Sequence, residues 1–282
     1  MLLGDKTVAF IGSGVMAEAM IKGLLSQKLL TGEQLIAADP REERGRELAG
    51  QYGLRTTVDN AAAVDGADIV VIATKPQVIG QVFHSINGKT SRASLILSIL
   101  AGVKIATLAE GMFNPNIVRA MPNTPAQIGQ GITVWTATPE VPESQRQQAQ
   151  ALLGALGEEM YVDDEKYLDM ATALSGTGPA YIFLFMEALI DAGVHMGFSR
   201  RDAERLVLKT MRGSVDYAMH SGLHPAQLRN QVTSPGGTSA EAIYQLEKGG
   251  LRTVISRAVW AAYQRSVSLG RAQKRGKSDD ED

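Results

Sequence analysis

The chain has 282 residues, of which 44% are hydrophobic and 21% are charged, and its formal net charge at pH 7 is −2. A chain of this length and apolar content can bury a large core, and it fits one large domain or two smaller ones. The nearly balanced charge argues against a basic nucleic-acid surface, and the lack of cysteine excludes disulfides, thiolate catalysis and cysteine-based metal sites. We therefore expect small molecules and other subunits as partners, and no nucleic acid.

The N-terminal stretch MLLGDKTVAFIG lacks the charged start, the long apolar core and the small-residue cleavage site of a signal peptide. No apolar stretch approaches the length that a membrane-spanning helix needs. We therefore expect a cytoplasmic protein with no membrane partner.

The first half of the chain alternates short apolar runs with amphipathic stretches. The apolar runs predict strands over residues 7–12, 35–39, 68–74, 94–100 and 116–121. Residues 15–29 separate the first two runs and place their large apolar side chains on one helical face. Continuous apolar strands between amphipathic helices are typical of a parallel sheet covered on both faces, which predicts an α/β, doubly wound fold. A further strand over residues 131–137 and a helix opened by Pro142 complete a first domain of residues 1–162.

The pattern changes near Asp163, after which the segments are helical in character. Residues 163–270 should therefore form an all-helical second domain. Within it, residues 181–190 (YIFLFMEALI) are apolar around most of the helix circumference, which predicts burial on every side, either in a central helix or at a subunit interface. Residues 271–282 are charged and nearly free of apolar side chains, so we expect them to form a disordered tail.

A glycine motif lies where the first predicted strand meets the first predicted helix. It reads Gly12-x-Gly14-x-x-Ala17, and Asp39 ends the next predicted strand. The first glycine permits the tight turn, the second lets the backbone approach a pyrophosphate, and the alanine allows the helix to pack closely on the strand. The start of the helix then offers unpaired N–H groups to the anion. This context favours a dinucleotide-binding, Rossmann-type domain over an ordinary strand-to-helix turn.

The sequence leaves the preference between NADPH and NADH open. An acidic residue such as Asp39 usually bonds the ribose 2′-hydroxyl of NAD, whereas a nearby arginine can accommodate the 2′-phosphate of NADP. Arg41 and Arg44 are candidates for the second role, and they can equally be surface residues of an exposed helix.

Four further stretches stand out as candidate ligand-binding turns. ATKPQ (residues 73–77), SILAG (98–102) and RAMPNTPA (119–126) each follow a predicted strand, and LSGTGPAY (174–181) lies in the helical domain. Because ligands bind outside the carboxyl ends of the strands in an open α/β sheet, the first three should line one crevice with the glycine loop. Each turn taken alone also has an ordinary structural interpretation.

Together, and in this order, these motifs resemble the pyrroline-5-carboxylate reductase family. The resemblance is carried by FIGSGVMAEAMIKGLL, ATKPQ, SILAGV, RAMPNTPA, ALSGTGPAY and VTSPGGTSAEAI, and it extends from about residue 7 to residue 269. It implies a Rossmann domain followed by a helical dimerisation domain. It also implies the reduction of 1-pyrroline-5-carboxylate to L-proline with NADPH or NADH, the final step of proline biosynthesis, by a homodimer that can assemble into a decamer.

The resemblance further implies roles for individual residues. The pyrophosphate of the cofactor would lie against Ile11, Gly12, Ser13, Gly14, Val15 and Met16, and its adenosine ribose would lie by Asp39 and Arg41. Asn60 would be a further cofactor contact. The nicotinamide half would be lined by Ala73, Thr74, Lys75, Pro76, Ile99, Leu100 and Ala101. The substrate would meet Gly236, Gly237, Thr238 and Ser239, with Glu165 as a further neighbour.

The chain departs from the usual family pattern at four positions. Val15 stands where many members have asparagine, Thr177 lies within a motif that usually reads SGSGP, Ser239 replaces a threonine, and Gln231 stands where an asparagine is sometimes found. Ser239 keeps the hydroxyl, whereas Gln231 puts one cofactor contact in question.

The segment TSPGGTS (residues 233–239) suits an anion such as the substrate carboxylate. Thr238 and Glu241 have capping-box spacing, which predicts a helix start, and Gly236 and Gly237 can present successive N–H groups to the carboxylate. The hydroxyls of Thr238 and Ser239 can complete these contacts, and Ser239 can relay a proton to the imine nitrogen. We expect no metal, because the chemistry needs none and the four histidines lack ligand-like spacing.

Two other functions compete with this interpretation. A β-hydroxyacid dehydrogenase of the same architecture usually has a catalytic lysine in its helical domain. In this chain Lys209 is the only lysine of that domain that lies neither near the domain ends nor in the segment SAEAIYQLEKGG, and it sits in an ordinary amphipathic helix, which indicates a surface residue. A non-catalytic dinucleotide sensor would bind the cofactor without turning over the imine.

Overall fold

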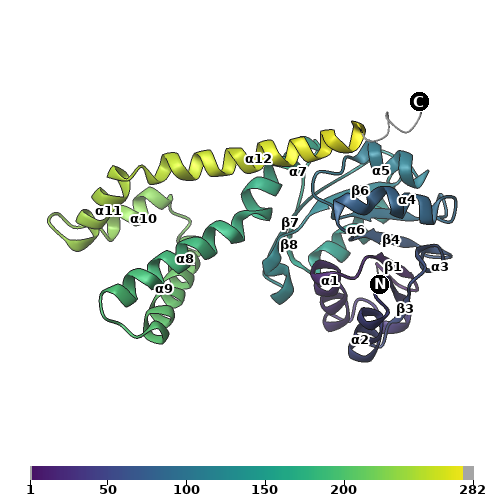
Figure 1. The fold of residues 1–282 in the computed structure, drawn as a ribbon, viewed down its shortest axis with the longest axis horizontal. Coiled ribbons are helices and arrows are strands. Elements are labelled where there is room, and N and C mark those ends of the chain that lie inside the picture. Colours follow the sequence, from purple (N-terminus) through teal and green to yellow (C-terminus); the bar gives the residue numbers. More distant parts are fainter. Residues whose placement is uncertain (1, 276–282) are drawn as a thin grey trace. The chain divides into compact units, whose positions relative to one another are not determined.

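The computed structural model describes the backbone of residues 2–275 and the side chains of residues 2–270, which form two compact units (Figure 1). Among the described residues, the first unit comprises residues 2–177 and 262–275, and the second unit is Gly178–Ala261.

The first unit is built on one eight-stranded sheet. The strand order is β3-β2-β1-β4-β5-β6-β7-β8, and all neighbours are parallel except β6 and β7, which are antiparallel. The strands are β1 (Val8–Ile11), β2 (Leu35–Ala38), β3 (Arg55–Thr57), β4 (Ile69–Ile72), β5 (Leu95–Ser98), β6 (Ile117–Met121), β7 (Gly131–Ala137) and β8 (Gly157–Tyr161). The doubly wound prediction is confirmed, although the sequence patterns identified neither edge strand, β3 or β8.

Helices cover both faces of this sheet. They are α1 (Val15–Ser26), α2 (Glu42–Tyr52), α3 (Asn60–Val64), α4 (Ile79–Ile86), α5 (Ile105–Met112), α6 (Glu143–Gly154) and α7 (Lys166–Ala171), with short helical turns at η1 (Gly32–Gln34), η2 (Pro76–Val78), η3 (Thr124–Ile128) and the π-turn η4 (Thr172–Gly176). Phe10 and Leu97 belong to an apolar cluster completed by α1 and α6, whereas their strand neighbours Ile11 and Ile96 belong to a second cluster completed by α3, α4 and α5. Because side chains alternate between faces, strands buried on both sides must be apolar throughout.

The second unit is entirely helical in its regular structure. It contains α8 (Gly178–His195), α9 (Arg200–Ser221), α10 (Pro225–Gln231), α11 (Thr238–Lys248) and the first part of α12 (Leu251–Arg275). The helices α8 and α9 approach closely, since a Cβ on Gly193 would lie 3.0 Å from the Cβ of Ala203. From Ala262 onwards α12 belongs to the first unit, where a Cβ on Gly270 would lie 2.6 Å from the carbonyl oxygen of Gly102.

The second unit leaves most of its apolar side chains uncovered. Gly193 and Ala203 are its only buried residues, whereas Phe183 is 60% exposed and Leu184 is 67% exposed. The chain alone therefore does not bury residues 181–190, and the central-helix alternative fails. An apolar surface of this extent is typical of an interface with another chain.

The ends of the units differ from the predicted domain limits. The division falls after Thr177, beyond the predicted boundary at residues 162/163, because α7 packs on the sheet, where Leu168 is buried with Val134 of β7. At the other end, α12 continues to Arg275, so the predicted tail of residues 271–282 begins inside a helix, and its residues 276–282 lie outside the described part.

One stretch corrects the expectation that no segment approaches the length of a membrane span. Lys166–His195 forms a continuous helical run that passes as membrane-spanning by length and composition alone. The π-turn η4 carries the helix through the motif Gly176-Thr177-Gly178-Pro179. A single helix of this kind is weak evidence for a membrane, and its exposed apolar side chains are also those that a second chain would cover.

Candidate cofactor and substrate sites

The two loop glycines after β1 face different surroundings. Gly12 has φ +89°, and a Cβ there would lie 2.9 Å from the carbonyl carbon and oxygen of Ala73, so the protein itself requires glycine. Gly14 has an ordinary φ of −69°, and a Cβ there would meet no atom within 4 Å. The chain therefore keeps an open space at Gly14, as a loop that admits a pyrophosphate must.

The open space adjoins a row of unpaired N–H groups. The N–H of Gly12 bonds Ala38 O at 2.8 Å and that of Ser13 bonds Asp39 Oδ2 at 3.1 Å. The N–H groups of residues 14–16 have no acceptor among the residues that the structure describes, because they lie at the first turn of α1. Of the predicted pyrophosphate residues, Ile11 lies inside β1, and residues 14–16 present the N–H groups that an anion can use.

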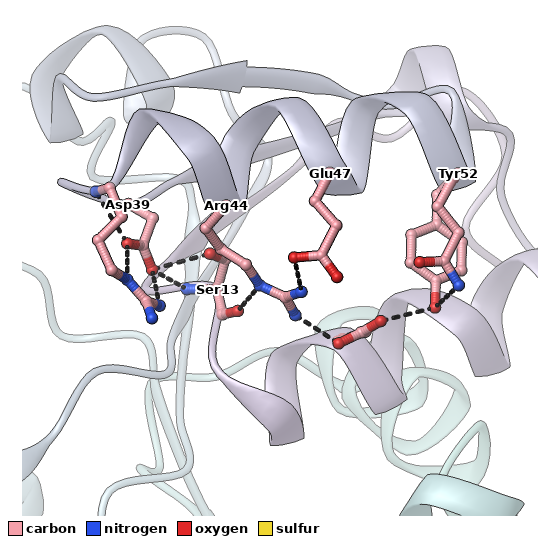
Figure 2. Close-up of polar contacts among 8 residues, drawn as sticks. Ser13, Asp39, Arg44, Glu47 and Tyr52 are labelled. Atoms are coloured by element: carbon pink, nitrogen blue, oxygen red, sulfur yellow. Dashed lines mark hydrogen bonds and ion pairs between the residues drawn. The ribbon is translucent and has the colours of Figure 1, made fainter.

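Asp39 lies directly after β2, is 7% exposed, and accepts hydrogen bonds from the phosphate loop and from its own turn (Figure 2). The hydroxyl of Ser13 donates to Oδ2 at 2.8 Å, and Arg41 Nε donates to Oδ1 at 2.8 Å. Burial works to raise the pKa of Asp39, but the hydrogen bonds from Arg41 and Ser13 outweigh it and hold the pKa far below its usual range. Asp39 is therefore a carboxylate at any physiological pH.

Arg44 differs from Arg41 in its surroundings (Figure 2). Its Nε donates to Ser13 O at 3.1 Å, its Nη1 to Glu47 at 2.7 Å, and its Nη2 to Glu18. Its side chain is 15% exposed, against 65% for Arg41. Arg44 thus joins α2 to α1 and to the Ser13 carbonyl, whereas Arg41 remains open to solvent.

The turn after β4 lies beside the glycine loop, and the turn after β5 follows the next strand of the sheet. In the sheet Ile11 pairs with Ile72 and Ile72 with Ser98, so residues 73–76 and 99–101 follow neighbouring parallel strands at one edge. The strand order reverses between β1 and β4, which is where ligands bind in such sheets. Thr74 Oγ1 is buried there without a hydrogen-bond partner.

Two other predicted residues are held by the protein itself. Asn60 lies in the first turn of α3 and donates from Nδ2 to Ser85 Oγ at 2.9 Å. Glu165 Oε1 accepts from Ile105 N at 2.8 Å and from the buried guanidinium of Arg119 at 2.6 Å. Glu165 therefore satisfies the start of α5, which leaves its role beside the substrate a prediction.

Arg119 belongs to a buried ionic cluster beneath this edge of the sheet. Asp169 Oδ1 accepts from Arg119 Nη2 at 3.2 Å and from Ser266 Oγ at 3.0 Å, and Asp169 Oδ2 accepts from Lys104 Nζ at 2.6 Å. Burial works to raise the pKa of Asp169, but the bonds and charges of Lys104 and Arg119 hold it below its usual value. The cluster joins β6, α7 and α12.

In the second unit, TSPGGTS forms a turn and a helix start, but the expected capping box is wrong. Gly236 has φ +71°, and Gly237 N donates to Ser234 O at 3.1 Å, which closes a turn with Pro235 at its second position. Gly237 is the N-cap of α11, so the Thr238 hydroxyl lies one residue too late to cap the helix, and the Glu241 carboxylate instead accepts from Gln245 at 2.8 Å.

The anion-binding groups of this segment consequently shift by one or two residues. The N–H of Gly237 is used inside the turn, whereas those of Thr238, Ser239 and Ala240 have no acceptor within the described part of the chain. Three successive open N–H groups at the start of an eleven-residue helix are an arrangement that favours anions such as carboxylates. Thr238 and Ser239 remain in position to add their hydroxyls.

Sequence reasoning missed Ser13 as more than a loop residue. Its N–H, hydroxyl and carbonyl are all bonded, to Asp39 and Arg44, which fixes the phosphate loop to β2 and α2. The available signal was a hydroxyl residue between two glycines with an acid at the end of the next strand. No cluster of three or more histidine, cysteine, aspartate or glutamate side chains suited to a metal occurs among the described residues.

Comparison with known proteins agrees with this arrangement. A family model described as pyrroline-5-carboxylate reductase dimerisation matches residues 165–269, and one described as NADP oxidoreductase coenzyme F420-dependent matches residues 7–102. A pyrroline-5-carboxylate reductase from Synechocystis sp. is 40% identical, with 94% of this chain and 98% of the relative covered; one from Pseudomonas aeruginosa is 41% identical, with 93% and 96% covered. The crystal structure of Plasmodium falciparum pyrroline carboxylate reductase with NADP bound has a TM-score of 0.86 at 33% identity, and the match covers 94% of this chain and 98% of that one.

Proposed function

Because this chain belongs to the pyrroline-5-carboxylate reductase family, we propose that it reduces 1-pyrroline-5-carboxylate to L-proline with a hydride from NADPH or NADH. The protein is an NAD(P)H-dependent oxidoreductase, and this reaction is the final step of proline biosynthesis. The proposal rests on the row of open N–H groups at the start of α1, at the switch point of the sheet, in a chain that aligns almost entirely with these reductases.

The residues present fit a dinucleotide. Residues 14–16 offer N–H groups to the pyrophosphate, and the open space at Gly14 admits it. Arg41 lies at the adenosine ribose, and residues 73–76 and 99–101 line the nicotinamide half at the ends of β4 and β5. When bound, the reduced nicotinamide supplies the hydride that the imine carbon accepts.

The start of α11 suits the substrate, which carries a carboxylate and an imine nitrogen. The N–H groups of Thr238, Ser239 and Ala240 bind the substrate carboxylate, and the two hydroxyls add hydrogen bonds to it. An imine accepts hydride well only when its nitrogen carries a proton, so a hydroxyl near that nitrogen must support or relay the proton. Ser239, which is half-buried, takes this role, and Thr238 assists at the carboxylate.

The exposed faces of the helical unit serve a homodimer, which can assemble further into a decamer. A unit with only Gly193 and Ala203 buried gains too little from its own packing, so a second copy must cover α8 and its neighbours. This interface accounts for the apolar Lys166–His195 run without a membrane, and we place the enzyme in the cytoplasm. The proposal includes neither a nucleic-acid partner nor a metal.

One assay tests the proposed reaction. Oxidation of NADPH or NADH should be followed at 340 nm with 1-pyrroline-5-carboxylate as substrate, and L-proline should form in equal amount. Ser239→Ala should lower kcat/KM while leaving cofactor affinity unchanged, and the exposed Ser26→Ala at the end of α1 is the matched control. No turnover by the wild type would refute the reaction, and an unaltered kcat/KM in Ser239→Ala would remove Ser239 from it.

A further inference from the structure

The carboxylate of Asp39 has no hydrogen-bonding capacity left for a ribose (Figure 2). Its Oδ1 accepts from the N–H of Arg41 at 3.1 Å and from Arg41 Nε at 2.8 Å. Its Oδ2 accepts from Ser13 N at 3.1 Å, Ser13 Oγ at 2.8 Å and Arg41 Nη2 at 3.0 Å. A carboxylate has about four lone-pair sites, and these five donors fill them. Binding the ribose diol of NADH through Asp39 would require one of these bonds to break.

Arg41, in contrast, keeps hydrogen-bond donors that no protein group uses within the described part of the chain. A guanidinium carries five N–H donors, and only those from Nε and Nη2 to Asp39 are used. Its Nη1 has no acceptor among the described residues, and its side chain is 65% exposed. The remaining donors suit the oxygens of a phosphate, which accept paired bonds from arginine.

Neither neighbouring arginine offers the same combination. Every nitrogen of the Arg44 guanidinium donates to Ser13, Glu47 or Glu18. Arg46 lies within 3.9 Å of Glu42 and is held by no shorter contact in the described structure. Asp39 and Arg46, but not Arg41, are among the residues that line a cavity of about 250 Å³ between α2 and β3, so Arg46 is the competing candidate that the variants below must separate from Arg41.

We propose that Arg41 selects NADPH over NADH, and that Asp39 is a positioning residue that holds Arg41 and the phosphate loop together. This assignment rests on the proposed function, since it concerns the same cofactor. Asp39 and Arg41 form a pair with no net charge, so the carboxylate does not repel the 2′-phosphate as an unpaired acid would. The Asp39–Ser13 bonds tie the ribose end of the site to the pyrophosphate end.

The first test is Arg41→Ala. We expect the Kd for NADPH, measured by titration of nucleotide fluorescence, to rise about tenfold or more, because a charge-assisted pair is lost. The Kd for NADH should stay within about twofold. Arg55→Ala is the matched control, because it removes the same charge from an exposed position at the amino end of β3, whereas Asp39 and Arg41 follow the carboxyl end of β2. A larger loss of NADPH affinity in Arg46→Ala than in Arg41→Ala would overturn the assignment.

The second test separates positioning from repulsion. Asp39→Asn should weaken both cofactors and lower the NADPH to NADH affinity ratio, because Arg41 loses its anchor. Ser13→Ala should weaken both by a similar factor and leave that ratio unchanged. A rise in the ratio for Asp39→Asn would show that the carboxylate repels phosphate, and would refute the proposal.

Measuring the ratio on each variant cancels any fraction of protein that fails to fold. Because the readout is binding, the assignment can fail while turnover of the imine persists. Conversely, the wild type could fail to reduce the imine while Arg41→Ala still lowered its affinity for NADPH relative to NADH. That result would refute the proposed reaction and leave the role of Arg41 standing.

Discussion

Replacing Gly14 by alanine should weaken cofactor binding without unfolding the protein. The residue has φ −69° and ψ −179°, which alanine adopts freely, and its Cβ would meet nothing within 4 Å. Alanine restricts the unfolded chain, which stabilises by about 0.4–1 kcal/mol, but it is a poorer N-cap for α1 than glycine by a similar amount. The two effects offset, so the free energy of unfolding should change by less than about 0.5 kcal/mol.

Cofactor affinity should respond very differently. The added methyl group fills the space next to the N–H groups of residues 14–16, so the pyrophosphate loses close approach to at least one of them. A lost hydrogen bond to a charged group is worth about 1.5–3 kcal/mol, which corresponds to a Kd for NADPH raised about tenfold to a hundredfold. Fluorescence titration and urea unfolding on the same preparation measure both quantities.

Gly12→Ala provides the contrast. Its φ is +89°, and its Cβ would lie 2.9 Å from Ala73 backbone atoms, so strain and collision should cost about 3 kcal/mol of stability. If Gly14→Ala bound NADPH with wild-type affinity, the pyrophosphate would not approach this loop. If it lost stability as Gly12→Ala should, the space at Gly14 would not be open.

Three further outcomes follow from the buried cluster and the exposed helices. Asp169→Asn should lower the free energy of unfolding by about 3 kcal/mol, because Arg119 stays buried with one carboxylate fewer, whereas Asp164→Asn in an exposed pair should leave it nearly unchanged in the same urea titration. The pKa of Asp169 in the folded protein lies below its usual 3.8, so the stability that its ionised form contributes is present above pH 3.8 and is lost as the pH falls through the folded-state pKa. Acid unfolding monitored by circular dichroism should therefore begin below about pH 4. Asp169→Asn should make the free energy of unfolding less dependent on pH in that range. Leu184→Glu should give a monomer in analytical ultracentrifugation while Leu2→Glu, also exposed, keeps the wild-type mass; an unchanged mass in Leu184→Glu would place the interface elsewhere.

The central strands could be predicted from sequence because burial on two faces leaves a continuous apolar signature. Ile69–Ile72 reads IVVI, and every one of its residues is buried. The edge strands lack that signature: β3 has three residues, and β8 alternates exposed Glu158 and Met160 with a partly covered glutamate. An edge strand has one neighbour and one half-solvated face, so its residues carry too little pattern to distinguish it from a loop.

Site residues divide along a similar line. The phosphate loop was located from spacing alone, because its two glycines stand at a fixed interval between a strand and a helix, although only Gly12 has a positive φ. The helix start at Thr238 was also local, but the choice of Gly237 as N-cap depended on the turn closed by Ser234, which the capping-box spacing does not encode. The unpredicted cluster around Asp169 joins residues up to 97 positions apart, and no local pattern reports such pairs.

The role of Asp39 shows why residue type underdetermines function at a strand end. An acid there binds a ribose if its lone pairs are free, and positions its neighbours if they are taken, and the two roles predict opposite effects of removing it. The deciding signal was present as Asp39-Pro40-Arg41: an aspartate side chain commonly accepts the N–H two residues ahead, and the observed bond to Arg41 N at 3.1 Å is of this kind. That turn brings the guanidinium of Arg41 back onto the carboxylate, and Ser13 fills the second oxygen from the phosphate loop. Cofactor preference in such a site therefore depends on how many acceptors the turn leaves open, which makes the donors around the acid more informative than the acid itself.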